Sequence, residues 1–413
     1  MLHTNATAPN LPAFVCCPAR GGVSQDCMRR LALLLALIVA TPAAADEFKF
    51  GLQLDESATA LPREAVLTAT QDARTNCTPA TAPSEDCALG LVAAAELLAT
   101  AGLFDEAERA ARTALTMMET LRGPAHEDTS VVRGMLGAVL LRGGRYGEAE
   151  PVLRVAAQTL QASASGDPEL LADHLMNLGI VLAEQRRYAE AEPALRRAVA
   201  VRQDKLPDNL LAIATARSNL GVLLARMGRD QDALAEQQAA FAIRRDRLKA
   251  SHYDLGTSML NLAELLARQP DAARLIAEPY LRAGLMTREA VLPPGDPRTT
   301  LAQTMLAENL DAQGKRTGAL ELYLLAYAGG RETLSPDAPL RIRAAHNLAR
   351  FLAANGTGLP VARTLLREAA TGVLTRTARA PGFDESSRAD LSQWRGVFAG
   401  GVAVAWRLGA ATQ

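Results

Sequence analysis

Residues 186–199, RRYAEAEPALRRAV, decide the fold of this chain. Residues 144–157 read GRYGEAEPVLRVAA, so nearly the same string stands 42 positions earlier. The same spacing of 42 separates the alanines and the leucines of successive units: Ala107, Ala149, Ala191 and Ala233, and Leu136, Leu178, Leu220 and Leu262. A fixed period of this kind indicates a repeat protein, in which each unit packs only against its neighbours.

Each repeat is predicted to be a pair of helices. The first, helix A, carries a leucine, a small residue and another leucine one turn later, as in Leu178-Gly179…Leu182. The small residue lets the second helix, helix B, approach closely, while the leucines fill the seam between the two. A polar turn joins the helices. The pattern slips by about two residues near Pro270 and gives about seven repeats over residues 86–380.

A proline at position 193 stands inside the decisive stretch. In a helix interior a proline costs about 3 kcal/mol, because it removes a backbone donor and clashes with the preceding turn. The first four N–H groups of a helix have no partner within it, so a proline there forfeits almost nothing. We therefore expect helix B to begin near Ala189, so that Pro193 ends its first turn. Pro151 and Pro279 are expected to mark the same point in their own repeats.

Residues 177–199, NLGIVLAEQRRYAEAEPALRRAV, resemble the tetratricopeptide repeat, and within that family the longer kinesin-light-chain type. GPAHEDT at 123–129 resembles the linker of that type, and PGDPRTT at 294–300 is a weaker echo of it. The resemblance implies an all-α fold. It would be an α-solenoid of helix-turn-helix repeats that forms a right-handed superhelix with a concave groove.

The N-terminal residues 28–45 are typical of a signal peptide. Its parts are a positive start, Met28-Arg29-Arg30, an apolar run, Leu31–Ala40, and a cleavage site, Ala43-Ala44-Ala45. The apolar run is too short to span a membrane, which takes about 20 residues. We expect a mature start near Asp46, a periplasmic or secreted location, and no stable membrane span. Residues 1–27 are then an upstream extension, because translation would begin at Met28.

Two cysteines, Cys77 and Cys87, would remain after cleavage. In an oxidising compartment an even pair favours a disulfide, and two free buried thiols are the alternative. The bond would tie an N-terminal cap segment, residues 46–85, to the first repeat. Residues 381–413 are predicted to form a C-terminal capping helix. That helix would be capped by Asp384 and would run through Trp394 and Phe398 towards Trp406, with Trp394 and Trp406 packing in the cap rather than binding a ligand.

Binding residues are suggested by the resemblance, which implies that helices A line the groove. It also implies that an asparagine just before the Leu-Gly pair contacts the backbone of a bound peptide. Four repeats have this residue: Asn177, Asn219, Asn261 and Asn347. An amide offers both a donor and an acceptor, which suits an extended peptide backbone. The alternative is that each amide bonds to the neighbouring helix within the stack.

A charged row lies two helical turns beyond the asparagine position, on the same face of helix A. Its members are Arg142, Glu184, Arg226 and Arg268. The row is mostly basic, and arginine suits bidentate binding of a carboxylate. It therefore predicts contacts with an acidic group of a partner. The alternative is a solvated face whose charges pair locally.

Several function classes find no support in the sequence. A formal net charge of −1 gives no broad footprint for nucleic acid. His126 and His252 lie in turns between repeats, where we expect them to cap helices, and His174 and His346 lie on helices A without triad partners. No HExxH, P-loop or GxSxG motif appears. We therefore expect no catalysis, no metal and no cofactor.

The sequence as a whole predicts a non-enzymatic scaffold or adaptor that is exported and binds a protein or peptide in its concave groove. Two alternatives from other classes stay open. One is a structural envelope protein that associates with copies of itself, and the other is a hydrolase with an unrecognised site. Neither the partner nor the oligomeric state follows from the residues.

Overall fold

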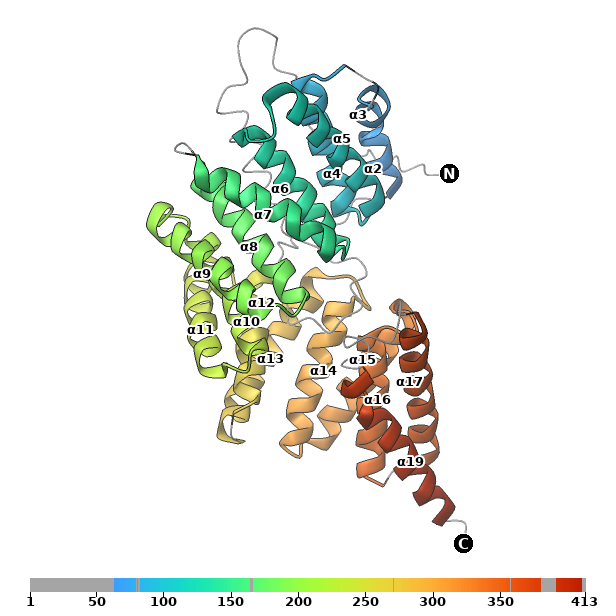
Figure 1. Cartoon of the computed structure of the whole chain (residues 1–413). Helices are drawn as coiled ribbons and strands as arrows, with labels where there is room; N and C mark the ends of the chain where they lie inside the picture. The colour runs from blue at the N-terminus through green and yellow to red at the C-terminus, as the bar shows by residue number, and fades with distance from the viewer. Residues whose placement is uncertain are drawn as a thin grey trace, which may run out of the picture.

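A computed structural model shows the chain as an array of helices (Figure 1). It describes residues 63–78, 80, 82–163, 166–269, 271–356, 358–379 and 391–410. Within these ranges every regular element is an α-helix. The predicted signal peptide, the mature start and the helix cap at Asp384 lie outside the described residues.

Fourteen helices of the described residues form seven consecutive pairs. The helices A are α4 (Glu85–Thr100), α6 (Glu127–Arg142), α8 (Pro168–Glu184), α10 (Leu210–Arg226), α12 (Tyr253–Ala267), α14 (Pro297–Ala312) and α16 (Pro339–Ala354). The helices B are α5 (Phe104–Arg122), α7 (Tyr146–Ala162), α9 (Tyr188–Lys205), α11 (Asp230–Arg247), α13 (Asp271–Val291), α15 (Arg316–Thr333) and α17 (Leu359–Arg379). Each helix packs most closely against its own partner and next against the following pair. The predicted α-solenoid is therefore confirmed.

Small residues on helix A bring the two helices of a pair together. A Cβ atom added to Gly179 of α8 would lie 2.6 Å from Leu195 Cγ of α9. One added to Gly137 of α6 would lie 2.4 Å from Leu153 Cγ of α7. Both leucines are fully buried, so these contacts lie within the core. The predicted role of the small residue after the first leucine is confirmed.

The turn from helix A to helix B uses a left-handed residue in most repeats. Gly144, Gly228 and Gly314 have φ angles of 73°, 75° and 74°. Arg186 takes this place in the third pair with a φ of 60°, and it is the one non-glycine residue with positive φ among the described residues. A side chain in this conformation costs roughly 1–2 kcal/mol, because its Cβ approaches the following carbonyl oxygen.

Replacing Arg186 by glycine is expected to raise the free energy of unfolding by about 0.5–1 kcal/mol. The strain of the left-handed residue is relieved, although glycine loses more chain entropy on folding. Gly228→Arg provides the reciprocal control, because it places an arginine in the same turn of the next repeat and should cost a similar amount. Chemical denaturation measures both. Equal stability of the two variants and the wild type would contradict the argument.

The hydrophobic core changes at the fifth pair. One continuous cluster of buried side chains extends from Val66 to Leu265, and a second extends from Leu260 to Val404. The two meet on α12, next to the place where the sequence period slips near Pro270. Helix α13, which follows, is 21 residues long, whereas α9 and α11 have 18 each. The slip therefore marks a change in how successive pairs share their core.

The prediction that Pro193 marks the start of helix B is wrong. Helix α9 begins at Tyr188, so Pro193 is its sixth residue, and Pro151 is likewise the sixth residue of α7. Pro279 lies inside α13. All three prolines are exposed to solvent. Water can therefore hydrate the helix carbonyl that loses its hydrogen bond, which limits the cost of each proline.

Further helices pack against both ends of the array. Helices α2 (Arg63–Ala69) and α3 (Gln71–Asn76) lie against α4, and α19 (Arg395–Ala410) lies against α16 and α17 (Figure 1). Trp394 is 7% exposed and packs between α16, α17 and α19. Trp406 is 79% exposed, so the prediction that it packs within the cap is wrong.

Candidate functional site

Helices A line one side of the solenoid. Each helix A contacts the helix A of the next pair along the whole array, from α4 to α16. Successive helices B make no comparable contact in the described part of the chain. The helices A are therefore closer together and form the inner surface of the curved array, while helices B form its outer surface. The candidate residues of the sequence lie on this inner side of each pair.

The four asparagines are all buried, and Asn219 has no exposed surface. Asn261 Nδ2 donates to Ser218 Oγ of α10 over 3.5 Å, and Asn347 Nδ2 donates to Glu308 Oε1 of α14 over 2.7 Å. Both bonds join one helix A to the preceding helix A. Such bonds match the alternative interpretation, in which each amide bonds to the neighbouring helix within the stack. A ligand in the groove cannot touch Asn219 in this conformation, so that part of the prediction fails.

The charged row pairs locally. Arg226 Nη1 lies 3.0 Å from Glu184 Oε1, which belongs to the preceding repeat. Arg268 lies 3.0 Å from Glu264 and 3.3 Å from Asp230. Arg142 is buried near Glu96, and the two charges interact. The local ion pairs match the alternative interpretation of the row, although Arg268 keeps more than a third of its side chain exposed.

The last three pairs bring five polar side chains of the inner surface together. We call Glu264, Arg268, Glu308, Arg343 and Asn347 the inner cluster. Arg343 Nη2 donates to both oxygens of Glu308, over 2.8 and 2.7 Å, while Asn347 donates to the same carboxylate. These side chains come from α12 and its C-cap residue Arg268, from α14 and from α16. Sequence reasoning selected two members, Arg268 and Asn347, and missed the other three. Glu308 and Arg343 pair with each other although they lie 35 residues apart in the chain.

Burial raises the pKa of two carboxyl groups at one repeat position of the inner surface. It raises the pKa of Glu264 to about 7, against the opposing effect of Arg268. It raises the pKa of Glu96 to about 7 as well, against the opposing effect of Arg142. Glu96 and Glu264 both stand three residues after the asparagine position of their repeats. These carboxyl groups therefore change charge near neutral pH.

Glu264→Gln is expected to stabilise the protein above pH 7 by about 1–2 kcal/mol. The folded protein holds the Glu264 proton more tightly than the unfolded chain, whose glutamate has a pKa near 4.3. The wild type therefore loses stability as the pH rises from about 4 to about 7, and the glutamine variant loses less. Thermal unfolding across this range measures the difference. A constant offset at every pH would show that Glu264 does not titrate in this window.

An ion-pair ladder runs along the edge formed by the turns between helices A and B. It consists of Arg145–Glu108, Arg187–Glu150, Arg229–Glu192 and Lys315–Glu278. In every rung the cation stands 37 residues after its carboxylate and joins two successive repeats. The hydrogen bond from Lys315 lowers the pKa of Glu278 below its usual range. The constant spacing of 37 was the signal that could have predicted the ladder.

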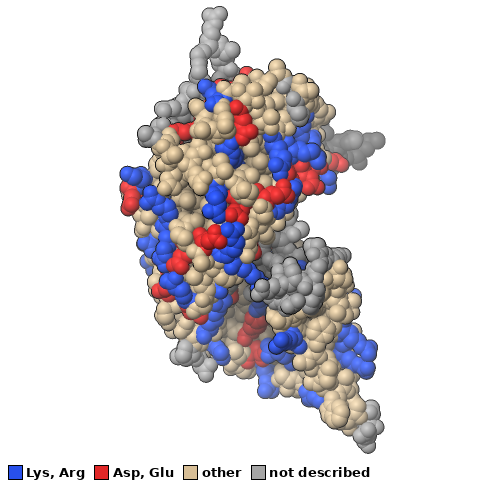
Figure 2. Space-filling model, in the orientation of Figure 1, with Lys and Arg blue, Asp and Glu red and all other residues tan. Residues whose placement is uncertain are grey.

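Alternating positive and negative side chains of this kind are visible on the surface in Figure 2. Beside the second rung lies an open cavity of about 610 Å³, lined by the turn before α7, by the start of α7 and by Gln185 of the third pair. Gln185 Nε2 donates to the carbonyl of Tyr146 across it, over 2.9 Å. The edge is thus held together by bonds between repeats. Exposed pairs of this type contribute little individually, at most about 1 kcal/mol each.

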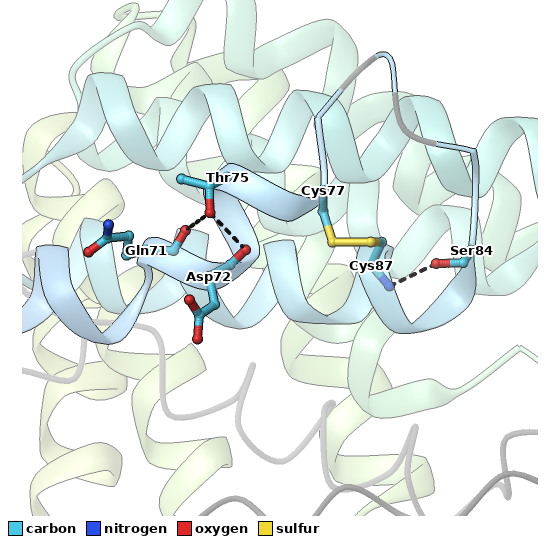
Figure 3. Close-up of a disulfide and its surroundings, with 6 residues drawn as sticks. All are labelled: Gln71, Asp72, Thr75, Cys77, Ser84 and Cys87. Carbon is cyan, nitrogen blue, oxygen red and sulfur yellow. Dashed lines mark hydrogen bonds between the residues drawn. A yellow bond between two sulfur atoms is a disulfide. The ribbon is translucent and has the colours of Figure 1, made fainter.

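The predicted cysteine pair is joined in the structure, where a disulfide links Cys77 to Cys87 (Figure 3). The bond connects the end of α3 to the first turn of α4. Ser84 caps α4 in the same turn by accepting from the backbone N–H of Cys87. The disulfide therefore holds α3 against the first pair. A loop this short contributes on the order of 3 kcal/mol when it closes without strain.

The histidines have structural surroundings. His126 and His252 are the N-caps of α6 and α12, since each Nδ1 accepts from a backbone N–H two residues later. Their predicted capping role is confirmed. His174 is buried, and burial lowers its pKa to about 4. In the described ranges, no cluster of three or more His, Cys, Asp or Glu residues is placed to hold a metal. The same ranges contain no helix long and apolar enough to cross a membrane.

Comparisons with known proteins support the repeat. The family model of the tetratricopeptide repeat matches residues 86–162 and 170–245. The chain contains tetratricopeptide repeats. The matched segments correspond to the first four pairs, α4 to α11, and the structure continues the series to α17 with three more pairs among the described residues. No curated protein matches the chain by sequence.

Solved structures with a similar fold are distant in sequence. The signal transduction ATPase PH0952 of Pyrococcus horikoshii, which has a tetratricopeptide repeat sensor, gives a TM-score of 0.54 at 13% identity over 71% of this chain and 42% of its own. Apo RapI gives 0.52 at 12% identity, over 71% of this chain and 99% of its own. A putative kinesin light chain repeat structure of Podosopora anserina gives 0.41 at 23% identity, over 49% and 94%. The first two show that the fold of 71% of this chain is shared with known helical proteins.

Proposed function

We propose that this tetratricopeptide repeat protein is an exported scaffold that binds a polypeptide partner on its inner surface. The observation that carries the proposal is the inner cluster. Glu264, Glu308 and Arg343 each keep between a fifth and a third of their side chain exposed, although each is also hydrogen-bonded. A partner that crosses α12, α14 and α16 would meet both donors and acceptors there. Such groups suit a polar, extended segment.

The site proposed for binding thus differs from the row of asparagines in the first repeats. Asn177 and Asn219 lie where the inner surface is buried, whereas the inner cluster lies in the last three pairs and keeps contact with solvent. Asn347 belongs to both sets. It donates a hydrogen bond to Glu308 and so orients that carboxylate. The role proposed for Asn347 is therefore to position a carboxylate, and the contact with the partner is proposed for Arg268, Glu308 and Arg343.

A periplasmic or secreted location is part of the proposal. It rests on the apolar segment Leu31–Ala40 and the small residues that follow it. The disulfide between Cys77 and Cys87 supports an oxidising compartment, since such bonds persist there and are rare in the cytosol. N-terminal sequencing of the exported protein tests the location, and a mature chain that retains residues before Asp46 would contradict the proposed cleavage.

Site-specific photo-crosslinking in the source cells tests partner binding. A photoreactive amino acid at Arg350, half exposed beside the inner cluster, is expected to form a discrete adduct with the partner. The same amino acid at Met286, which is exposed on the outer helix α13, is the matched control and should form none. Reversing the cluster charges with Arg343→Glu should abolish the inner adduct while the circular dichroism stays helical. Adducts from Met286 alone would place the partner on the outer surface.

A further inference from the structure

Helix α19 at the C-terminal end of the solenoid is apolar on every side. Its sequence, RGVFAGGVAVAWRLGA, has two charged residues, Arg395 and Arg407, and no carboxylate. A helix of this composition is normally buried on all faces. Terminal repeats of a solenoid usually turn a polar face outward, because nothing covers them. The composition of α19 departs from that rule.

One face of α19 packs and the opposite face does not. Trp394, Val397 and Val404 are buried against α16 and α17. Phe398, Val402 and Trp406 are 37%, 73% and 79% exposed. The three are four residues apart, so they form one straight stripe over two helical turns. An exposed apolar stripe of this kind indicates an interaction site rather than chance, because single exposed apolar residues are normally scattered.

The end of the array that carries the stripe has more arginines than carboxylates. Helix α17, which supports α19, carries Arg363, Arg367 and Arg376, and its one carboxylate, Glu368, is paired with Arg341. By sequence, residues 359–413 contain seven arginines and four carboxylates, whereas the whole chain has a net charge of −1. The end of the molecule formed by α17 and α19 appears blue and tan in Figure 2. The occupant of the stripe is therefore expected to be negatively charged.

We propose that α19 docks on an anionic membrane surface. The helix would lie in the plane of the interface, with Phe398, Val402 and Trp406 in the boundary between headgroups and acyl chains. The surrounding arginines would face the anionic headgroups. Its 16 residues are too few to span a bilayer, which takes about 20, so the geometry is that of a helix lying on the surface. Tryptophan suits this depth because its ring is apolar and its N–H is polar.

Shape and charge favour a membrane over the other occupants. The stripe lies on the exposed side of a single helix at the end of the array, and in the described residues α19 packs only against α16 and α17, so no second wall is there to enclose a peptide. A symmetric dimer through α19 would bring two positive ends together, and like charges across an interface are costly. A fluid anionic surface needs no complementary shape and supplies the missing negative charge.

Vesicle binding followed by tryptophan fluorescence tests the proposal on the purified chain. The chain has two tryptophans, and Trp406 is the exposed one. Vesicles that contain phosphatidylglycerol are expected to shift its emission to the blue and to protect it from acrylamide, whereas pure phosphatidylcholine vesicles are not. Added salt should weaken the binding, because surface charges are screened. Val402→Gln combined with Trp406→Gln should weaken co-sedimentation roughly tenfold or more.

Met286→Gln is the matched control, because Met286 is 70% exposed on the outer helix α13, away from the stripe, and its removal should leave vesicle binding unchanged. Failure of the wild type to bind phosphatidylglycerol vesicles would overturn the proposal. So would protection of Trp406 by self-association, seen as concentration-dependent sedimentation without lipid. Equal loss of vesicle binding in the Met286 variant would show that binding does not depend on α19.

Discussion

Gly179→Leu is expected to lower the free energy of unfolding by about 3 kcal/mol or more. A Cβ at this position would lie 2.6 Å from Leu195 Cγ and 2.8 Å from Leu195 Cδ2, which is closer than unbonded carbons can approach. Leu195 is 1% exposed, so its side chain cannot move aside into solvent. Helix α9 must therefore separate from α8, and overpacking of a tight core, with the backbone shifts that it forces, typically costs about 1–3 kcal/mol and occasionally more.

Gly147→Leu is the matched control for this substitution. Gly147 is exposed in α7, and nothing lies within 4 Å of an added Cβ. Leucine is also the better helix former, so this variant should keep or slightly increase the stability. Urea denaturation of the two variants measures the contrast. Similar stability of both would show that α8 and α9 are not held at the distance seen in the structure.

The fold follows from residues whose effect is local. The leucine and small-residue pattern of helix A, together with the alanines of helix B, determines which faces meet inside one pair. Gly179 and Leu195 show this, because their contact lies between two helices that are adjacent in the chain. A period of 42 then repeats the same contact in the next pair. The number of pairs and their order could be predicted for that reason.

The roles of polar residues depend on distances between repeats, which a period does not supply. Asn261 and Asn347 bond to residues of the preceding helix A, so their amides join repeats as well as facing inward. Arg226 and Glu184 occupy the same position in successive repeats, and their opposite charges pair across the stack. The inner face was predicted correctly from the resemblance. Which of its groups remain exposed depends on how tightly the helices A pack, and the sequence does not fix that.

Pro193 was misplaced for a related reason. The rule that a proline belongs to the first turn of a helix assumes that its missing hydrogen bond is costly everywhere else. Pro193 is exposed on the outer surface of α9, where water reaches the carbonyl that it leaves without a donor. Burial decides the cost of the missing bond, and burial becomes known only once the solenoid has been assembled.

Asp173→Ala is expected to destabilise the protein by about 3–5 kcal/mol. Asp173 and Arg202 are both buried, and they form an ion pair between α8 and α9. Burial raises the pKa of Asp173 to about 6, even though Arg202 opposes the shift. Burial therefore disfavours the ionised form of the Asp173 carboxylate. The carboxylate stabilises the folded protein because it compensates the charge of the Arg202 guanidinium. Removing it leaves a buried positive charge without a counter-charge.

The next two repeats supply the control for this prediction. Arg244 and Arg288 occupy the repeat position of Arg202, and they donate to Thr215 and Thr257, which occupy the position of Asp173. Both arginines are buried, and each donates to a hydroxyl at the position where Arg202 meets a carboxylate. Asp173→Thr places a hydroxyl at the same position and should lower the free energy of unfolding clearly less than Asp173→Ala does.

The double variant Asp173→Leu with Arg202→Met should come close to wild-type stability, since an apolar pair can replace a buried ion pair. Thermal and urea unfolding of the three variants separate the lost charge from lost packing. Equal losses for the threonine and alanine variants would show that the carboxylate itself is needed. A large loss in the double variant would show that the ion pair contributes net stability.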